Sequence, residues 1–569
     1  MKRVLFIQSR RIATTLALGA AAITLHAQVR TGGGNPLDQL PGPVVAPTPA
    51  PVRLQVEGQG LAGAAADRLD RLVTPTRFDI EGVTAIPFAQ VAQLFTPMAS
   101  GPVTVRQLVA VAAEATALYR AQGNPLSFVY IPAQEFSGGV VRVVAVEGYI
   151  ADVRIEGDAG SAEPKLREIS KRLMQERPLR MATFERVSQL MSRVPGITVA
   201  AEAAMPGSTD GATVLVLKVR RQPYNVSLGA DLRKPVQRAM INGVLNEPLV
   251  PGGQVSASTL LGHFNLERLY TAGYTQLVGG DGLAFKGTYS DYRGFPDRQF
   301  DRGDPIERFN INRRAELSAS FPLLLNATSS MTLDGGAYAV NNTDNYKVPQ
   351  NGVTLTDETR MRALFAQLAW TDTTATRGRT ASLLVAQGLR VAGASAFQAS
   401  NTPGVAGKNT AKLDFTRAVL DASQRDRYAN NWGTAVTFGA QYSPDTLAAS
   451  ERVSFGGSRF GRGYAPGDAS GDSGWGMGVE LNRQFMVDGG PWLQQAEPYM
   501  LLEAAQVHNE VTQPRLRHLG SAAVGLRWTD RKHYSLDLAV AKPTGDSTVT
   551  NPQRSVRASL LFTYQLGTR

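Results

Sequence analysis

From Tyr224 to the end of the chain, apolar and polar residues alternate with a period of two. The clearest runs are residues 434–442, 534–541 and 558–566, where mostly apolar even positions alternate with mostly small or polar odd positions. This period is typical of β-strands, because successive side chains of a strand point to opposite faces. Aromatic residues lie toward the strand ends on the apolar face. The pattern predicts an antiparallel barrel with lipid outside and a wet interior.

The same alternation marks 16 strands, and the lengths of their connections test that count. The predicted strands begin near Tyr224, Val236, Gly253, Arg268, Leu283, Arg314, Met331, Met361, Arg379, Ala411, Trp432, Gly474, Glu497, Ser521, Tyr534 and Arg557. If the preceding residues lie in the periplasm, connections after odd strands face outside and are long. Long connections do follow strands 5 (294–313), 7, 9 and 11, whereas short ones, such as 279–282 and 529–533, follow even strands.

An internal repeat precedes the barrel. The sequence FDIEG at residues 78–82 returns as VRIEG at residues 153–157. Each copy is followed by apolar residues at helical spacing and then by a β-run led by glycine, at Gly138 and Gly211. The apolar positions are Leu108, Ala112, Ala115 and Tyr119 in the first unit, and Phe184, Val187, Leu190, Met191 and Val194 in the second. Both units therefore predict the order β-α-α-β-β, with coincidence between two α+β segments as the alternative.

The N-terminus predicts export. Residues 1–27 combine four basic residues with an apolar run over 12–25 and end on Ala27, which is the pattern of a cleaved signal peptide. A membrane anchor is the alternative, but the run is shorter than the ~18–20 residues needed to span a bilayer. Residues 28–75 predict a flexible linker, because 28–51 are rich in Gly and Pro, although 61–72 can form a short helix.

The composition and the absence of known motifs exclude several kinds of ligand and catalytic chemistry. The formal net charge is +11, of which the signal peptide contributes four, and the basic residues are scattered, so a nucleic-acid partner is not expected. The chain has no cysteine, which excludes disulfides and thiol chemistry. Neither the glycines around Gly461 nor Gly407-Lys408-Asn409 match a nucleotide-binding motif, and no HExxH or GxSxG sequence occurs. The sequence therefore predicts no enzyme activity, no cofactor and no metal site.

One glycine-rich segment lies between strands 11 and 12, in the sixth and longest outer loop, residues 444–473. Residues 459–481 read RFGRGYAPGDASGDSGWGMGVEL and contain seven glycines. At this point the chain resembles the two-partner secretion transporters (TpsB, the haemolysin secretion/activation type, ShlB/FhaC/HecB), which belong to the BamA-like superfamily of barrel-assembly proteins. The resemblance is carried by the tip Gly461-Arg462-Gly463-Tyr464 and by the run from Gly471-Asp472 to Glu480-Leu481.

The resemblance implies a fold and an organisation. It implies α+β POTRA domains followed by an all-β 16-stranded antiparallel transmembrane barrel. The POTRA units would be residues 76–148 and 149–222, and the barrel 223–569, with loop 444–473 folded into its lumen. The protein would lie in the outer membrane of a Gram-negative bacterium, with the POTRA units in the periplasm.

The resemblance also implies a function. The POTRA units would bind a large secreted exoprotein by its N-terminal secretion domain, and the barrel would pass it outward without nucleotide hydrolysis. Further partners would be outer-membrane lipid and the barrel-assembly machinery. An assembly factor of the same superfamily and, less favoured, a passive 16-stranded porin are the alternatives, but a porin leaves the POTRA units without a purpose.

Family members pair the loop arginine with an acidic residue in an F-x-D-x-G motif on strand 13. The matching stretch is residues 501–505, LLEAA, so the carboxylate would come from Glu503, with Asp537 on strand 15 as the second candidate. Strand parity places Glu503 on the lumen face. A guanidinium offers a rigid fork to such a carboxylate, and we therefore expect Arg462 to anchor the loop inside the barrel.

Overall fold

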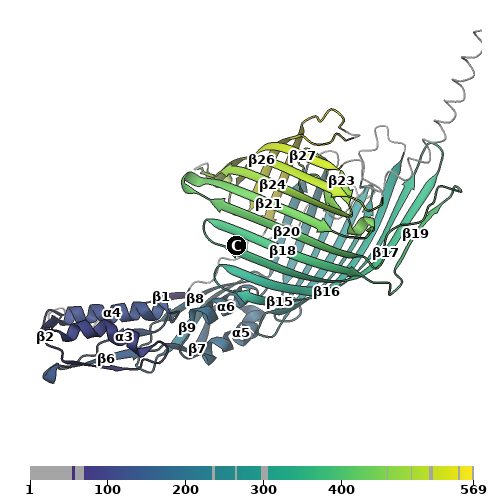
Figure 1. The fold of residues 1–569 in the computed structure, drawn as a ribbon. Coiled ribbons are helices and arrows are strands. Elements are labelled where there is room, and N and C mark those ends of the chain that lie inside the picture. Colours follow the sequence, from purple (N-terminus) through teal and green to yellow (C-terminus); the bar gives the residue numbers. More distant parts are fainter. Residues whose placement is uncertain are drawn as a thin grey trace, which may run out of the picture.

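The computed structural model describes residues 54–57, 69–232, 237–262, 266–296, 306–457, 459–487, 490–511, 517–548 and 551–566. The predicted signal peptide, its cleavage site and most of the predicted linker lie outside these residues. Two α+β units lead into a large β-barrel, and the three parts follow one another in space as they do in the sequence (Figure 1). None of the described helices combines the length and the apolar character that a membrane crossing requires.

The first unit has the predicted order β-α-α-β-β. Its main elements are β3 (Arg77–Glu81), α3 (Phe88–Phe95), α4 (Val105–Ala121), β5 (Phe128–Tyr130) and β6 (Val140–Val146), and the short strands β2 (Leu72–Val73) and β4 (Val103–Thr104) form a separate pair. Thr104 and Gln107 cap the start of α4 reciprocally. The apolar face predicted for this helix is buried against the sheet β3-β6-β5.

The second unit repeats this order. It consists of β7 (Tyr149–Gly157), α5 (Glu163–Gln175), α6 (Met181–Ser192), β8 (Ile197–Ala204) and β9 (Ala212–Arg221). The five apolar positions predicted from Phe184 to Val194 all belong to its buried core. The repeated glycines have one structural reason in both units. A Cβ atom would lie 2.2 Å from the carbonyl oxygen of Ala145 at Gly82, and 2.3 Å from that of Val219 at Gly157.

The sheet of the second unit contains one strand that was not predicted from the sequence. Strand β1 (Leu54–Glu57) pairs in parallel with Ala201–Ala204 of β8, so the sheet order is β1-β8-β9-β7. The expectation of a flexible linker over residues 28–75 was therefore wrong at residues 54–57. Its residues LQVE alternate apolar and polar, and the edge of β8 supplies the backbone partners that a short strand needs.

The remaining strands form a closed antiparallel barrel, in which β10 pairs with β29. Two barrel strands are each divided into two segments, β18 with β19 and β24 with β25, so the barrel has 16 strands, as predicted. The segments are β10 (Tyr224–Asp231), β11 (Arg238–Asn246), β12 (Gly253–Leu261), β13 (Glu267–Val278), β14 (Leu283–Gly294), β15 (Glu307–Leu325), β16 (Ser329–Lys347), β17 (Thr354–Thr373), β18 (Arg377–Gly388), β19 (Ser395–Ser400), β20 (Thr416–Arg427), β21 (Trp432–Tyr442), β24 (Ser473–Arg483), β25 (Phe485–Met486), β26 (Gln495–His508), β27 (His518–Thr529), β28 (Tyr534–Pro543) and β29 (Arg557–Leu566).

Some strands reach further than the sequence indicates. Strands β15 and β17 begin at Glu307 and Thr354, well before the predicted starts near Arg314 and Met361, whereas β20 begins later than predicted, at Thr416. The connection after the seventh strand is therefore only residues 348–353, and the prediction of a long outer connection there was wrong. The outer half of β17, residues 354–360, is mostly polar on both faces and so lacks the alternation that revealed the other strands, whereas Phe309 and Ile311 of β15 do alternate with polar residues.

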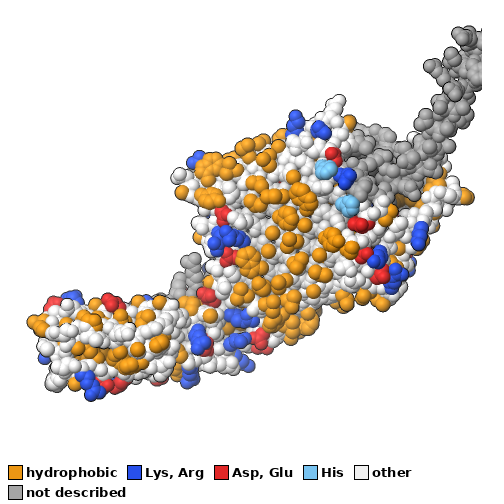
Figure 2. Space-filling view, viewed as in Figure 1, with side chains coloured by type: hydrophobic (Ala, Val, Ile, Leu, Met, Phe, Trp, Pro, Cys, Tyr) orange, Lys and Arg blue, Asp and Glu red, His pale blue; other side chains and the backbone are white. Residues whose placement is uncertain are grey.

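Strand parity in the barrel is as predicted. On β26, Met500 and Leu502 are 62% and 66% exposed, whereas Tyr499 and Leu501 on the opposite face are buried. Figure 2 shows hydrophobic side chains gathered over the outer wall of the barrel. This wall is the face that an outer-membrane barrel presents to lipid.

The second unit is docked against the turns at one end of the barrel. Its core includes Leu277 of β13 and Leu325 of β15. Arg172 of α5 forms an ion pair of 2.6 Å with Asp281 in the β13–β14 turn, and Lys165 donates to the carbonyl oxygen of Gly279 at 3.4 Å. The shared apolar core and these polar contacts fix the unit at the barrel entrance.

Candidate functional site

The long connection between β21 and β24 forms a hairpin that lies against the barrel wall. Its strands β22 (Val453–Phe455) and β23 (Ala469–Gly471) pair with each other. Phe455, Phe460 and Tyr464 of the hairpin share a buried cluster with Ala505 and Val507 of β26 and Leu519 of β27. These wall residues belong to the inward-facing parity of their strands, so the hairpin lies inside the lumen.

The tip of the hairpin is held first through its backbone. The amide groups of Gly461 and Arg462 donate to the same oxygen, Oε2 of Glu503, at 3.0 and 2.7 Å. Two adjacent amides converging on one carboxylate oxygen form a charge-assisted contact, which is stronger than a neutral hydrogen bond. Glu503 therefore holds the backbone of the turn, and not the side chain of Arg462.

The guanidinium of Arg462 reaches past Glu503 to a different strand. It donates to the hydroxyl of Tyr499 and lies 3.4 Å from Oδ2 of Asp537 on β28. The side chains of Arg462 and Asp537 are each 16% exposed. The contact expected between the guanidinium and Glu503 is replaced by one with Asp537, the second carboxylate that the sequence indicated, because Glu503 is already turned toward the backbone amides.

Asp537 belongs to a larger charged network on the lumen wall. It accepts a hydrogen bond of 2.6 Å from Tyr499 and lies 3.5 Å from Nε of Arg527. The Arg527 guanidinium lies over the Tyr499 ring, 4.0 Å from its centroid, and pairs with Glu480 and Glu497 at 2.5 and 2.9 Å. Neither Arg527 nor the part played by Tyr499 is among the site residues predicted from the sequence. The sequence did place both residues on the inward face of their strands. A charged side chain such as Arg527 on that face needs partners inside the barrel, and this was the signal that could have identified it.

The two remaining tip residues also contact the wall. The amide of Gly463 donates to Oγ of Ser521 at 3.0 Å, and a Cβ atom here would lie 2.6 Å from the backbone nitrogen of Pro543. Only glycine allows this close approach to β28. Tyr464 is buried, and its hydroxyl donates to the carbonyl oxygen of Asp546 at 3.0 Å.

Buried carboxylates hold the base of the hairpin. Asp472 is fully buried and accepts from the amides of Leu447 and Glu510 and from Nε of Arg452, at 2.9, 3.0 and 3.0 Å. Glu451, also fully buried, pairs with Arg417 of β20 at 3.0 Å. The hairpin is thus fixed at its base and at its tip.

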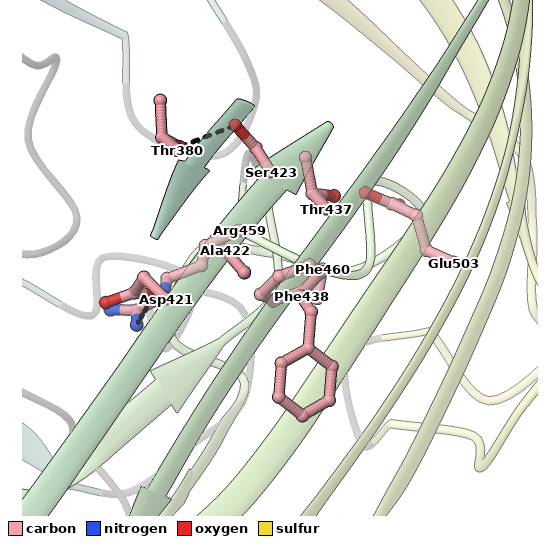
Figure 3. A pocket seen from close by; sticks show the side chains of 9 residues that line it. All are labelled: Thr380, Asp421, Ala422, Ser423, Thr437, Phe438, Arg459, Phe460 and Glu503. Atoms are coloured by element: carbon pink, nitrogen blue, oxygen red, sulfur yellow. Dashed lines mark hydrogen bonds and ion pairs between the residues drawn. The ribbon is translucent and has the colours of Figure 1, made fainter. Parts of the chain in front are cut away.

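A cavity of about 280 Å³ borders the hairpin on its β20–β21 side. Its lining residues are Thr380, Asp421, Ala422, Ser423, Thr437, Phe438, Arg459, Phe460 and Glu503 (Figure 3). Arg459 of the hairpin pairs with Asp421 of β20 at 3.3 Å. The cavity leaves space beside the inserted hairpin.

Two POTRA-like units, a closed barrel of 16 strands and an inserted hairpin with an RGY tip define the class of two-partner secretion transporters of the outer membrane. The protein family described as "POTRA domain, ShlB-type" matches residues 73–148. A second family, described as "Haemolysin secretion/activation protein ShlB/FhaC/HecB", matches residues 256–528. The chain belongs to this family, whose members are transporters rather than enzymes.

Relatives agree with this assignment. The outer membrane transporter CdiB of Escherichia coli O6:K15:H31 is 24% identical over 472 residues, which cover 80% of this chain and 76% of the relative. The solved structure of CdiB from Escherichia coli covers 100% of both chains, with a TM-score of 0.64 and 18% identity. CdiB from Acinetobacter baumannii covers 98% of both chains, with a TM-score of 0.56 and 15% identity. These two structures support the fold.

Family membership places the protein in the outer membrane, with its POTRA domains in the periplasm. It also makes the protein a secretion transporter and implies a secreted exoprotein as its partner.

Proposed function

We propose that the two periplasmic units recognise the N-terminal domain of a large exoprotein, and that the barrel passes this cargo outward in an extended form. Folding of the cargo outside would supply the direction of transport, without nucleotide hydrolysis. The apolar outer wall would contact outer-membrane lipid, and the barrel-assembly machinery would insert the barrel. The observation that carries the recognition step is the pairing of β1 with β8.

The edge of β8 is suited to binding an extended segment. Strand β1 pairs with only the last four of the eight residues of β8. An edge strand offers a row of backbone donors and acceptors to any extended chain, and β1 is an example of such an addition. We propose that a cargo strand replaces β1 and extends along the whole of β8.

Two other sheet edges, β5 and β7, are less suited. On β5, the hydroxyl of Thr116 accepts from the amide of Val129 at 2.9 Å and donates to its carbonyl oxygen at 3.3 Å, so both backbone groups are already bonded. Strand β7 has an irregular register between Ile150 and Asp152. A bulge twists an edge away from regular pairing.

The inserted hairpin divides the lumen in this account. The contacts of Arg462 with Tyr499 and Asp537, together with those of Glu503, hold the tip against β26–β28. Cargo would then pass on the side of the cavity that Asp421 and Thr437 line. We propose that Gly461, Arg462, Gly463 and Tyr464 fix the hairpin in the position that transport requires.

Two fragments test the recognition step. Residues 54–222 contain β1 and residues 69–222 lack it. Each is titrated calorimetrically with the N-terminal domain of the partner exoprotein. We expect both fragments to bind and 69–222 to bind more tightly, because no strand has to be displaced. Binding by neither fragment would contradict the recognition role, and equal affinities would contradict the use of the β8 edge.

A further inference from the structure

Three arginines lie together on the outward face of the barrel wall, at the ends of β13, β14 and β15 that are remote from the periplasmic units. This arginine cluster consists of Arg268, Arg293 and Arg313. Arg268 lies directly opposite Arg293 in the antiparallel pairing of β13 with β14. Arg313 on β15 lies opposite Asp291 of β14, on the same face. Two cross-strand pairs thus bring three cations and one carboxylate together.

The cluster lies above an apolar part of the wall. Toward the periplasm the same outward face continues with Tyr270, Tyr289 and Leu317, all of them exposed. Leu283 and Arg293 are ten positions apart on β14. Ten residues extend about 33 Å along a strand, which at a tilt of about 35–45° spans roughly the 25 Å height of an apolar band. The cluster therefore lies at the level of the outer lipid headgroups, with tyrosines beneath it as in an aromatic girdle.

One carboxylate serves all three arginines. Asp291 contacts the guanidinium of Arg293 through both of its oxygens, at 3.1 and 3.2 Å, and accepts from Nε of Arg313 at 3.2 Å. Among the described residues, the side chain of Arg268 has no hydrogen-bond or ion-pair partner, and the two Nη groups of Arg313 donate to no acceptor. The cluster therefore has donors left over after Asp291 is fully used.

The surroundings supply no second acid within the described part of the wall. Glu267 is next to Arg268 in the sequence, but it has the opposite parity and pairs with Arg238 at 2.8 Å. The outward neighbours on the adjoining strands are uncharged, because they are Thr259 on β12 and Asn341 on β16. The positive charge of the cluster is therefore not balanced by the surrounding wall.

We propose that the arginine cluster binds the phosphate group of a lipid headgroup in the outer leaflet of the membrane. Like charges directly opposite each other destabilise a sheet, and a bound anion would relieve the repulsion between Arg268 and Arg293. Guanidinium groups match phosphate oxygens with paired hydrogen bonds. A lipid can place its phosphate on the cluster and its acyl chains against the apolar wall below, which a free phosphate ion cannot do. A headgroup bound there would fix the height of β13–β15 in the membrane.

Lipids that differ only in their phosphates test this site. The full-length protein is folded in an uncharged detergent, and the affinities of diphosphorylated lipid A and of dephosphorylated lipid A are measured by native mass spectrometry. We expect the phosphorylated lipid to bind about tenfold more tightly, as expected for a hydrogen bond to a charged group. Millimolar inorganic phosphate should not displace it. Equal affinities of the two lipids would overturn the inference, and displacement by inorganic phosphate would overturn the assignment to a lipid.

Variants assign the binding to the cluster. Arg268→Gln removes a guanidinium that has no acidic partner, and it should remove most of the preference for the phosphorylated lipid. Lys542→Gln is the matched control. Lys542 is exposed on the outward face near the outer end of β28, but the residue opposite it is Ala522 and not a second cation. The control loses the same charge and should keep the preference.

Folding of each variant is checked by the heat-dependent gel mobility of folded barrels. If Arg268→Gln does not fold, Arg313→Gln takes its place, because it removes the free Nη donors of the same cluster. A preference that persists in a folded cluster variant, or that is lost equally in Lys542→Gln, would overturn the inference.

A secretion assay in cells separates this inference from the proposed function. The inference rests on the proposed contact of the outer wall with lipid, but the cargo has no part in the binding measurement. If the natural protein exports its exoprotein and does not distinguish the two lipids, only the lipid site fails. If it prefers the phosphorylated lipid and exports no exoprotein, the proposed export fails and the lipid site stands.

Discussion

Glu503 and Asp537 divide the binding of Arg462 between them. Glu503 on β26 accepts from the backbone amide of Arg462 at 2.7 Å, whereas Asp537 on β28 lies 3.4 Å from its guanidinium. One carboxylate therefore holds the turn of the hairpin and the other holds the side chain at its tip. The two carboxylates should respond differently to substitution.

A double-mutant cycle tests this division. Asp537→Asn should loosen the hold of the barrel wall on the hairpin tip about as much as Arg462→Ala does. The double variant should be little worse than either single variant, because both substitutions remove the same contact between Arg462 and Asp537. Glu503→Gln should add to Arg462→Ala, since the backbone amides remain in the alanine variant. The exported fraction of exoprotein is measured for each variant. Non-additive effects of Glu503 and Arg462 would contradict the division.

Release of the tip can be measured directly, because the chain has no cysteine. Ala465 is fully buried in the hairpin, so a maleimide reagent should label Ala465→Cys slowly. Adding Arg462→Ala should raise the labelling rate, because it removes the contact with Asp537 that holds the hairpin tip against the wall and so exposes position 465 more often. Breaking a buried pair costs about 3–5 kcal/mol, and the cost here should be smaller because the pair is partly exposed. Arg462→Lys should restore slow labelling only in part, because an ammonium lacks the guanidinium fork. An unchanged labelling rate in the alanine variant would show that the arginine does not hold the tip.

Gly463 should not tolerate a side chain. Gly463→Ala would place a Cβ atom 2.6 Å from the backbone nitrogen of Pro543, which cannot move without shifting β28. We expect fast maleimide labelling at position 465 and reduced secretion, as for Arg462→Ala. Gly378→Ala is the control, because nothing lies within 4 Å of the added atom on β18. Equal behaviour of the two variants would argue against close contact of the tip with the wall.

The first periplasmic unit should lose stability in acid through Glu147. Burial opposes ionisation of this carboxyl group, but hydrogen bonds from the amides of Ala85 and Thr84 and from the hydroxyls of Thr84 and Tyr119 keep its pKa below the usual value. The lowered pKa stabilises the unit above about pH 4.3, the ordinary glutamate value, and this contribution is lost as the pH falls through the pKa of the folded state. Thermal unfolding of residues 69–222 should show the loss, and Glu147→Gln should remove most of the pH dependence in this range. A dependence that is unchanged in the variant would assign it to other carboxylates.

Much of the architecture follows from periodicity. The alternation around Phe438 and Leu538 identified barrel strands, because lipid and water impose opposite requirements on the two faces of each strand. The parity of Glu503 followed from the same rule. The repeat at residues 78–82 and 153–157 revealed the two units because each copy has, at the end of a strand or directly after it, a glycine whose backbone lies too close to a carbonyl oxygen for a side chain.

Other features depend on the three-dimensional path of the chain. Whether the guanidinium of Arg462 meets Glu503 or Asp537 depends on how the turn at Gly461 faces the wall, and no spacing in the sequence encodes this. The pairing of β1 depends on the edge of β8, more than 140 residues away. The outer half of β17 lacks alternation, so its strand structure follows from pairing with β16 and β19.

The central claim is that this protein exports a partner exoprotein and needs Arg462 to do so. The most direct measurement is the amount of the partner exoprotein in the medium of cells that carry the natural transporter, Arg462→Ala or Asn341→Leu, at equal amounts of folded barrel in the outer membrane. The account predicts full export with the natural protein and with Asn341→Leu, and a severe loss with Arg462→Ala. Export that does not require the transporter, or that is undiminished in Arg462→Ala, would contradict it.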